Sequence, residues 1–195
     1  MQWTDEAIIL SHHKFSENSA VIRVFGKESG LFAGASRSAL SKKNRAIYES
    51  GNFVKAQWSA RLAEHLGTIQ CELTQPIAAF IMHDAAKLYA MQSLLAIIEK
   101  SFAERDPHQL LYSNVEDYLK SLATNTLWRE DYIKLELLLL SEAGFRLELD
   151  KCAATGTSDK LTYVSPKSGR AVSAEAGEPY KEKLLPLPSF LKPNH

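Results

Sequence analysis

The stretch FVKAQWSARL, residues 53–62, indicates most clearly how this chain begins to fold. Apolar side chains alternate with polar or charged ones through most of it. A period of two is typical of a β-strand that buries one face and exposes the other. The stretch therefore predicts a strand that turns Trp58 toward a core and leaves Lys55 and Arg61 in solvent.

Four further apolar runs in the first 73 residues predict strands at 7–11, 19–25, 31–35 and 67–73. Polar turns separate them, and Gly30 suits the positive φ that hairpin turns require. Five short strands without a long helical pattern favour a small Greek-key barrel of the OB-fold type. An SH3-like barrel would produce a very similar pattern.

The pattern changes at Thr74-Gln75-Pro76, where apolar residues begin to recur every three or four positions. This spacing predicts helices from Pro76 until Asp106-Pro107, at 108–123 and at 128–143. Turn-forming residues dominate from Asp150 onward, with a short strand expected at 161–165 and a short helix at 180–185. We therefore expect an α+β chain with a five-stranded OB-fold barrel at 1–73, an all-helical domain at 74–150 and an irregular segment at 151–195.

The 195 residues are 45% hydrophobic and 24% charged, which excludes a disordered chain. The formal net charge is zero, but residues 1–70 hold nine Lys and Arg against six Asp and Glu, whereas residues 71–150 hold seven against thirteen. Such segregation suggests that the basic part faces a polyanion. The longest apolar tract, 77–98, contains Asp84 and Lys87, so we expect no membrane span. Two distant cysteines and the lack of a signal-like start predict a cytoplasmic protein.

The segment Gly34 to Tyr48 carries four cations and no acid. Its small residues predict a loop or a lightly built turn of helix rather than core. A basic, flexible connection on a β scaffold is a natural contact for phosphates, although a solvated surface loop is the simpler alternative. Barrels of this kind bind single strands of nucleic acid with cations and with aromatic rings that stack on the bases. Tyr48 and Phe15 lie outside the alternating runs and are therefore the better candidates for stacking. The candidate nucleic-acid-binding residues are Arg37, Lys42, Lys43, Arg45, Arg23, Lys55, Arg61, Lys14 and Tyr48.

No catalytic motif is present, so we do not expect an enzyme. Cys152 lies in Cys-Ala-Ala-Thr-Gly, which lacks a second thiol at the usual gap of two residues. A single cysteine cannot hold a structural zinc ion, so we interpret Cys152 as a free, partly buried thiol and expect no metal or cofactor.

Short motifs stand in a defined order along the chain. They are Trp3-x-x-Glu6-Ala7-Ile8-Ile9-Leu10, Ser16-Glu17-Asn18-Ser19, Val24-Phe25-x-x-Glu28-Ser29-Gly30, Gly34-Ala35-x-Arg37-Ser38, Gly51-Asn52, Leu66-Gly67, Leu135-Glu136-Leu137-Leu138, Gly144-Phe145 and Cys152-x-x-x-Gly156. No single motif is specific, but the ordered set covers most of the chain and resembles the RecO family of bacterial recombination mediators and DNA repair proteins.

The resemblance implies an N-terminal OB-fold, a helical domain and, in some members, a zinc-binding insert. It implies a nucleoid-associated protein that binds single- and double-stranded DNA, anneals complementary strands and acts with RecR. It also implies contact with the acidic C-terminal tail of the single-strand DNA-binding protein, so that the recombinase RecA can replace that protein. Under this resemblance the loop cations would hold DNA phosphates, Lys134 would pair with the acidic tail, and Leu135 and Leu138 would border a pocket for its apolar end.

Two departures from the family pattern are visible. Zinc-binding members carry paired Cys-x-x-Cys motifs, whereas here Thr155 replaces one cysteine and Ser165-Pro166-Lys167-Ser168 stands at the place of a second pair. Family members usually continue with further helical sequence past the position of His195. Two alternatives stay open: a general single-strand binder without mediator activity, and an adaptor whose basic loop contacts an acidic protein instead of DNA.

Overall fold

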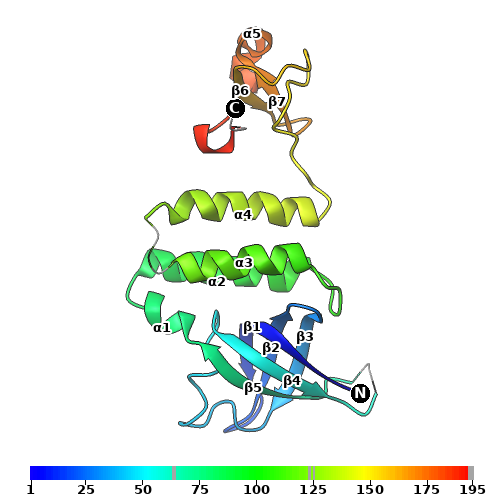
Figure 1. The fold of residues 1–195 in the computed structure, drawn as a ribbon, viewed down its shortest axis with the longest axis vertical. Coiled ribbons are helices and arrows are strands. Elements are labelled where there is room, and N and C mark those ends of the chain that lie inside the picture. Colours follow the sequence, from blue (N-terminus) through cyan, green and yellow to red (C-terminus); the bar gives the residue numbers. More distant parts are fainter. Residues whose placement is uncertain (63–64, 123, 125, 193–195) are drawn as a thin grey trace. The chain divides into compact units, whose positions relative to one another are not determined.

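A computed structural model describes residues 1–62, 65–122, 124 and 126–192 (Figure 1). The contacts within the chain divide it into two compact units, Met1–Leu135 and Glu136–His195. Each unit has a core of its own.

Five strands form a closed barrel at the start of the first unit. They are β1 (Gln2–Lys14), β2 (Ala20–Gly26), β3 (Gly30–Ser36), β4 (Phe53–Ser59) and β5 (Thr68–Gln75). The strand order is β1-β2-β3-β5-β4, and β4 pairs with β1 to close the barrel. All neighbours are antiparallel except β3 and β5, which meet in parallel at Ala35 and Thr68. The expected OB-fold barrel is confirmed.

Trp58 packs where β3 and β5 meet. Its indole Nε1 donates hydrogen bonds to the carbonyl oxygens of Ala33 at 3.1 Å and Leu66 at 2.9 Å. Gly34 permits the close approach of β3 and β5, because a Cβ atom at this position would lie 2.8 Å from Cβ of Ile69. Trp58, which the alternation in residues 53–62 predicted to face the core, therefore also links β3 and β5, two strands that share few backbone hydrogen bonds.

Four helices follow the barrel (Figure 1). They are α1 (Ile77–Ile81), α2 (Ala85–Ser101), α3 (Gln109–Leu122) and α4 (Trp128–Glu142). The single helix predicted from Pro76 to Asp106 is wrong, because the Asp84 carboxylate accepts hydrogen bonds from Ala86 N and Lys87 N and starts a separate helix. The predicted end of the second helix, Ala123, lies outside the described residues.

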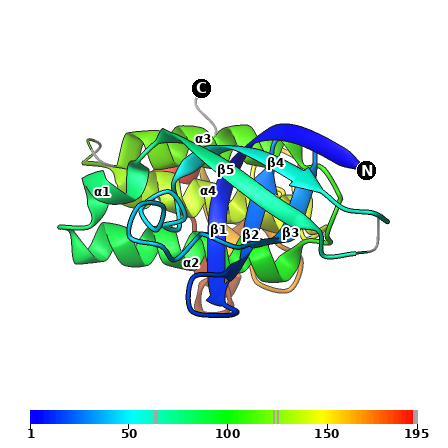
Figure 2. The same cartoon turned by 90° about the horizontal axis from the view of Figure 1, so that it is seen from below.

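The end of α2, the segment that follows it and α3 cover the hairpin formed by β2 and β3. Phe25 of β2 contacts Tyr112 of α3, with ring centroids 5.5 Å apart. Arg105 N donates a 2.9 Å hydrogen bond to Leu31 O, and the Asp106 backbone leaves no room for a side chain at Gly30. Seen from below in Figure 2, β4 and β5 lie in front of α2 and α3, whereas β1 also contacts α2.

The second unit contains a three-stranded sheet in the order β7-β6-β8. The strands are β6 (Leu161–Ser165), β7 (Arg170–Ser173) and β8 (Leu185–Pro186), accompanied by α5 (Ala174–Gly177) and short 3-10 turns at Glu178–Lys183 and Ser189–Leu191. The strand predicted at 161–165 is confirmed, and the segment expected to be irregular also holds β7 and β8. Residues 193–195 of that predicted segment lie outside the described part of the chain. No helix among the described residues is long and apolar enough to cross a membrane.

Candidate nucleic-acid interface

The basic loop, residues 37–51 between β3 and β4, is a series of hydrogen-bonded turns. Leu40 N donates to Asn18 O at 3.1 Å, and the Asn52 side-chain amide donates to Ala46 O at 2.8 Å. Ala39 and Tyr48 are buried against the barrel core. The loop is therefore anchored at both ends and in its middle, and its successive turns fit the loop or lightly built helical turn predicted from its small residues.

The four cations of the loop are all exposed: Arg37, Lys42, Lys43 and Arg45. Within the described ranges, none of the four forms an ion pair with an acid. Lys14 is exposed at the end of β1, and the turn that follows it is tied to the loop by a 3.2 Å hydrogen bond from Ser19 Oγ to Arg37 O. Only two carboxylates, Glu17 and Glu49, belong to residues 14–19 and the loop. Five exposed cations therefore gather at one end of the barrel with a local excess of positive charge.

Tyr48 does not have the exposed position expected of a stacking residue. Its side chain is 4% exposed, and its hydroxyl accepts hydrogen bonds from Ser36 Oγ at 3.1 Å and from Cys71 N at 3.4 Å. Burial raises the pKa of Tyr48, and the hydrogen bond with Ser36 opposes that rise. A ring in this position cannot stack on a base, whereas Phe15, in the turn that contacts the loop, is 76% exposed.

Arg23 lies apart from the loop cations and is engaged within the molecule. Its guanidinium contacts Glu104 at 2.8 Å and Glu99 at 3.5 Å. These contacts hold β2 against the end of α2 and the segment after it. A cation held between two carboxylates is a poor ligand for a phosphate, so Arg23 does not share the environment of the loop cations.

Lys55 and Arg61 also lie away from the loop cations. Lys55 points outward from β4, and its cross-strand neighbours are Glu6 on β1 and Glu72 on β5. Arg61 is exposed and follows the end of β4 that is opposite to the loop. The structure thus brings together five of the predicted cations and separates Arg23, Lys55 and Arg61 from them.

The three residues expected to bind a partner tail lie on α4. Lys134 is exposed and its Nζ lies 3.5 Å from Asp131 of the preceding turn. Leu135 is 5% exposed, so its side chain is packed in the interior, whereas Leu138 is partly exposed.

Cys152 is buried and has polar neighbours. Ser173 N lies 3.3 Å and Ser173 Oγ 3.5 Å from Cys152 Sγ. Burial raises the pKa of the Cys152 thiol, but hydrogen bonds with Ser173 and Thr155 outweigh this effect and lower it to about 6. In the part of the chain that the structure describes, no three His, Cys, Asp or Glu side chains are grouped as metal ligands.

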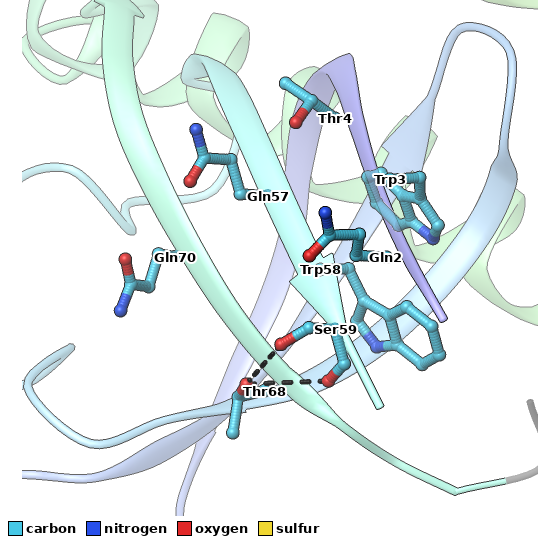
Figure 3. A pocket seen from close by; sticks show the side chains of 8 residues that line it. All are labelled: Gln2, Trp3, Thr4, Gln57, Trp58, Ser59, Thr68 and Gln70. Carbon is cyan, nitrogen blue, oxygen red and sulfur yellow. Dashed lines mark hydrogen bonds between the residues drawn. The ribbon is translucent and has the colours of Figure 1, made fainter. Parts of the chain in front are cut away.

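Sequence reasoning missed a groove of about 480 Å³ on β1, β4 and β5 (Figure 3). It is lined by Gln2, Trp3, Thr4, Gln57, Trp58, Ser59, Thr68 and Gln70. The alternation of 53–62 identified Gln57 and Ser59 as outward-facing residues. It could not show which residues of the other strands stand beside them, because strand pairing is a tertiary property.

Comparisons with known proteins agree with this architecture. The model of the recombination protein O N-terminal domain matches residues 1–77, and that of the C-terminal domain matches residues 82–194. The DNA repair protein RecO of Orientia tsutsugamushi (strain Ikeda) is 45% identical over 195 residues, which span 100% of this chain and 81% of that relative. The DNA repair protein RecO of Rickettsia bellii (strain OSU 85-389) is 44% identical over 191 residues, which span 98% of this chain and 78% of that relative. The resemblance noted in the short motifs is therefore confirmed, and the chain belongs to the recombination protein O family, RecO.

Proposed function

We propose that this protein is a DNA-binding recombination mediator in DNA repair, and that it holds the phosphate backbone with the basic loop and Lys14. The observation that carries the proposal is the gathering of five exposed cations on an anchored loop and at the adjoining end of β1. Family membership supports the repair role, since the relatives are named DNA repair proteins.

The proposed mechanism is binding and not bond-making chemistry. Cations that contact only phosphates bind every sequence with similar affinity, and this affinity falls as salt rises because bound counterions are released. The same contacts serve single and double strands. A protein that holds two strands close together raises their effective concentration and so promotes annealing.

Docking of protein partners is the second part of the proposal. RecR and the acidic tail of the single-strand DNA-binding protein are the proposed partners, and their binding would help to load the recombinase. Lys134 is exposed on α4 and supplies a positive charge suited to an acidic tail, with Leu138 as a partly exposed apolar neighbour one turn away. Leu135, being buried, would support the position of the helix.

The test is a titration of a fluorescently labelled single-stranded oligonucleotide, followed by anisotropy at low salt. The double substitution Lys42→Gln and Lys43→Gln should weaken binding by roughly tenfold for every sequence tried, because two phosphate contacts are lost. The matched control is Lys151→Gln with Lys167→Gln, which removes the same charge at exposed positions of the second unit and should leave the affinity unchanged.

The adaptor alternative predicts a different result. If the basic loop contacts an acidic protein, the wild-type chain should not bind the oligonucleotide even at low salt. Equal losses in the loop variant and in the control variant would also contradict the proposal, since they would show that overall charge and not the loop governs binding.

A further inference from the structure

The face of the barrel that OB-folds commonly use for oligonucleotides is largely covered in this protein. That face is formed by strands 2 and 3. Here Phe25 of β2 packs against Tyr112, Arg23 is held by Glu99 and Glu104, and Leu31 O accepts a hydrogen bond from Arg105 N. These contacts leave open a groove on the outward face of the start of β1, the end of β4 and the start of β5.

The strand register arranges the open face as two neutral cross-strand rows. One row is Gln2, Ser59 and Thr68, and the other is Thr4, Gln57 and Gln70. A third row follows and is charged: Glu6, Lys55 and Glu72. The six residues of the two neutral rows line the groove, while the charged row lies outside it.

The chemistry of the neutral rows suits an uncharged polar ligand. Each row combines amides, which donate and accept hydrogen bonds, with hydroxyls that do the same. None of the eight residues that line the groove carries a charge. The edges of nucleobases present the same mixture of donors and acceptors, whereas phosphates would find no cation here.

The groove lies at the end of β4 that is opposite to the end of the basic loop, but the start of the loop lies close to β5. Ala35 N donates a 3.0 Å hydrogen bond to Gly67 O, and the loop begins two residues after Ala35. On the same strand, Cys71 N, next to Gln70, lies 3.4 Å from the hydroxyl of Tyr48, which belongs to the loop. A strand whose phosphates lie on the loop could therefore reach the groove with its bases.

We propose that the groove on β1, β4 and β5 is a base-contacting subsite for single-stranded DNA. The amides of Gln57 and Gln70 and their neighbours bind base edges, while the basic loop holds the phosphates. This inference rests on the proposed function and adds that the bases themselves contribute to affinity.

The test compares two labelled oligonucleotides of equal length, one of thymidine nucleotides and one of abasic nucleotides with the same phosphates. The full chain should bind the thymidine oligonucleotide about fivefold more tightly, the effect of one or two hydrogen bonds. Gln57→Met with Gln70→Met keeps the size of both side chains but removes their hydrogen bonds, and it should abolish this preference. The matched control is Gln92→Met, an exposed amide on α2, which should retain the preference. Circular dichroism during thermal unfolding checks that the variants are folded.

Each other outcome is decisive. Equal binding of both oligonucleotides by the wild type would overturn the base-contacting subsite and leave phosphate binding by the loop intact. A preference that survives in the Gln57→Met, Gln70→Met variant would overturn it as well, because the bases would then lie elsewhere. Failure to bind either oligonucleotide would overturn the proposed function and this inference together.

Discussion

At the scale of single residues, chemical type alone does not decide the role of a cation or an aromatic ring. Arg23 and Lys42 both carry a positive charge, yet Arg23 is paired with Glu99 and Glu104 while Lys42 is exposed on the basic loop. Tyr48 is the opposite case, since it lies within a basic, polar stretch but its ring is part of the barrel core. The role of each of these side chains depends on the residues that it contacts in the folded protein.

The buried position of Tyr48 leads to a prediction about stability. Tyr48→Phe removes the hydroxyl that accepts hydrogen bonds from Ser36 Oγ and Cys71 N. Ser36 is 4% exposed, so its hydroxyl would lose a partner that water cannot easily replace. We expect the free energy of unfolding in urea to fall by about 1–2 kcal/mol, with DNA affinity unchanged.

A matched control is Tyr89→Phe, because Tyr89 is 71% exposed and its substitution should leave the unfolding free energy unchanged. A Tyr48→Phe variant of normal stability that had lost DNA affinity would contradict the core position and favour contact with DNA.

At the scale of elements, a capping side chain decides where α2 begins. The apolar spacing between Pro76 and Asp106 fits one long helix, but the Asp84 carboxylate accepts two backbone hydrogen bonds and starts α2. A capping side chain satisfies N–H groups that would otherwise have no partner in the first turn. One residue therefore divides a continuous apolar pattern into α1 and α2.

The cap predicts a specific pair of effects. Asp84→Ala should lower the free energy of unfolding by about 1 kcal/mol, whereas Asp84→Asn keeps an acceptor oxygen and should cost only a few tenths. Chemical denaturation followed by circular dichroism measures both. As a control for loss of a surface carboxylate, Asp117→Ala on the exposed face of α3 should have a smaller effect. Equal losses for the alanine and asparagine variants at residue 84 would show that charge and not capping matters there.

The strands illustrate how register creates a surface that no single strand contains. Gln57 and Ser59 of β4 stand between Thr4 and Gln2 of β1 on one side and Gln70 and Thr68 of β5 on the other. Each strand contributes only two of these neutral polar residues. Their arrangement in rows, bounded by Glu6, Lys55 and Glu72, follows from the pairing of three strands.

At the scale of the whole molecule, a net charge of zero conceals a local excess of positive charge at one end of the barrel. Acidic residues in other parts of the chain cancel this excess in the net charge. Binding to a polyanion therefore depends on the local cations and not on the net charge. The slope of DNA affinity against salt concentration therefore reports how many cations of the site contact phosphates.

This count gives the prediction for the intact protein. If the five gathered cations each neutralise one phosphate of a single strand, the logarithm of the association constant should fall with the logarithm of salt with a slope of about −3.5. Lys42→Gln with Lys43→Gln should reduce the slope by about 1.4. Anisotropy titrations at several salt concentrations measure both values, and Lys151→Gln with Lys167→Gln should retain the wild-type slope. A wild-type slope near zero would exclude phosphate contacts as the main source of affinity.

The sequence by itself determined the classes of structure and the family. The period of two in residues 53–62 and the change of period at Thr74 depend only on which side chains avoid water, so they revealed an α+β chain with a barrel first. The ordered motifs from Trp3 to Gly156 identified the RecO family, which the family models confirmed. The exposed cations of the basic loop could also be predicted from the sequence, because four cations without a nearby acid are rarely buried.

Only the tertiary structure decided which of these residues can act together. Burial of Tyr48, pairing of Arg23 with Glu99 and Glu104, and the rows of the groove all join residues far apart in the chain. Periodicity records the preference of each residue for water or core, but not the identity of its neighbours. Contacts between distant segments depend on register and packing, and these are fixed only when the barrel and the helices are assembled.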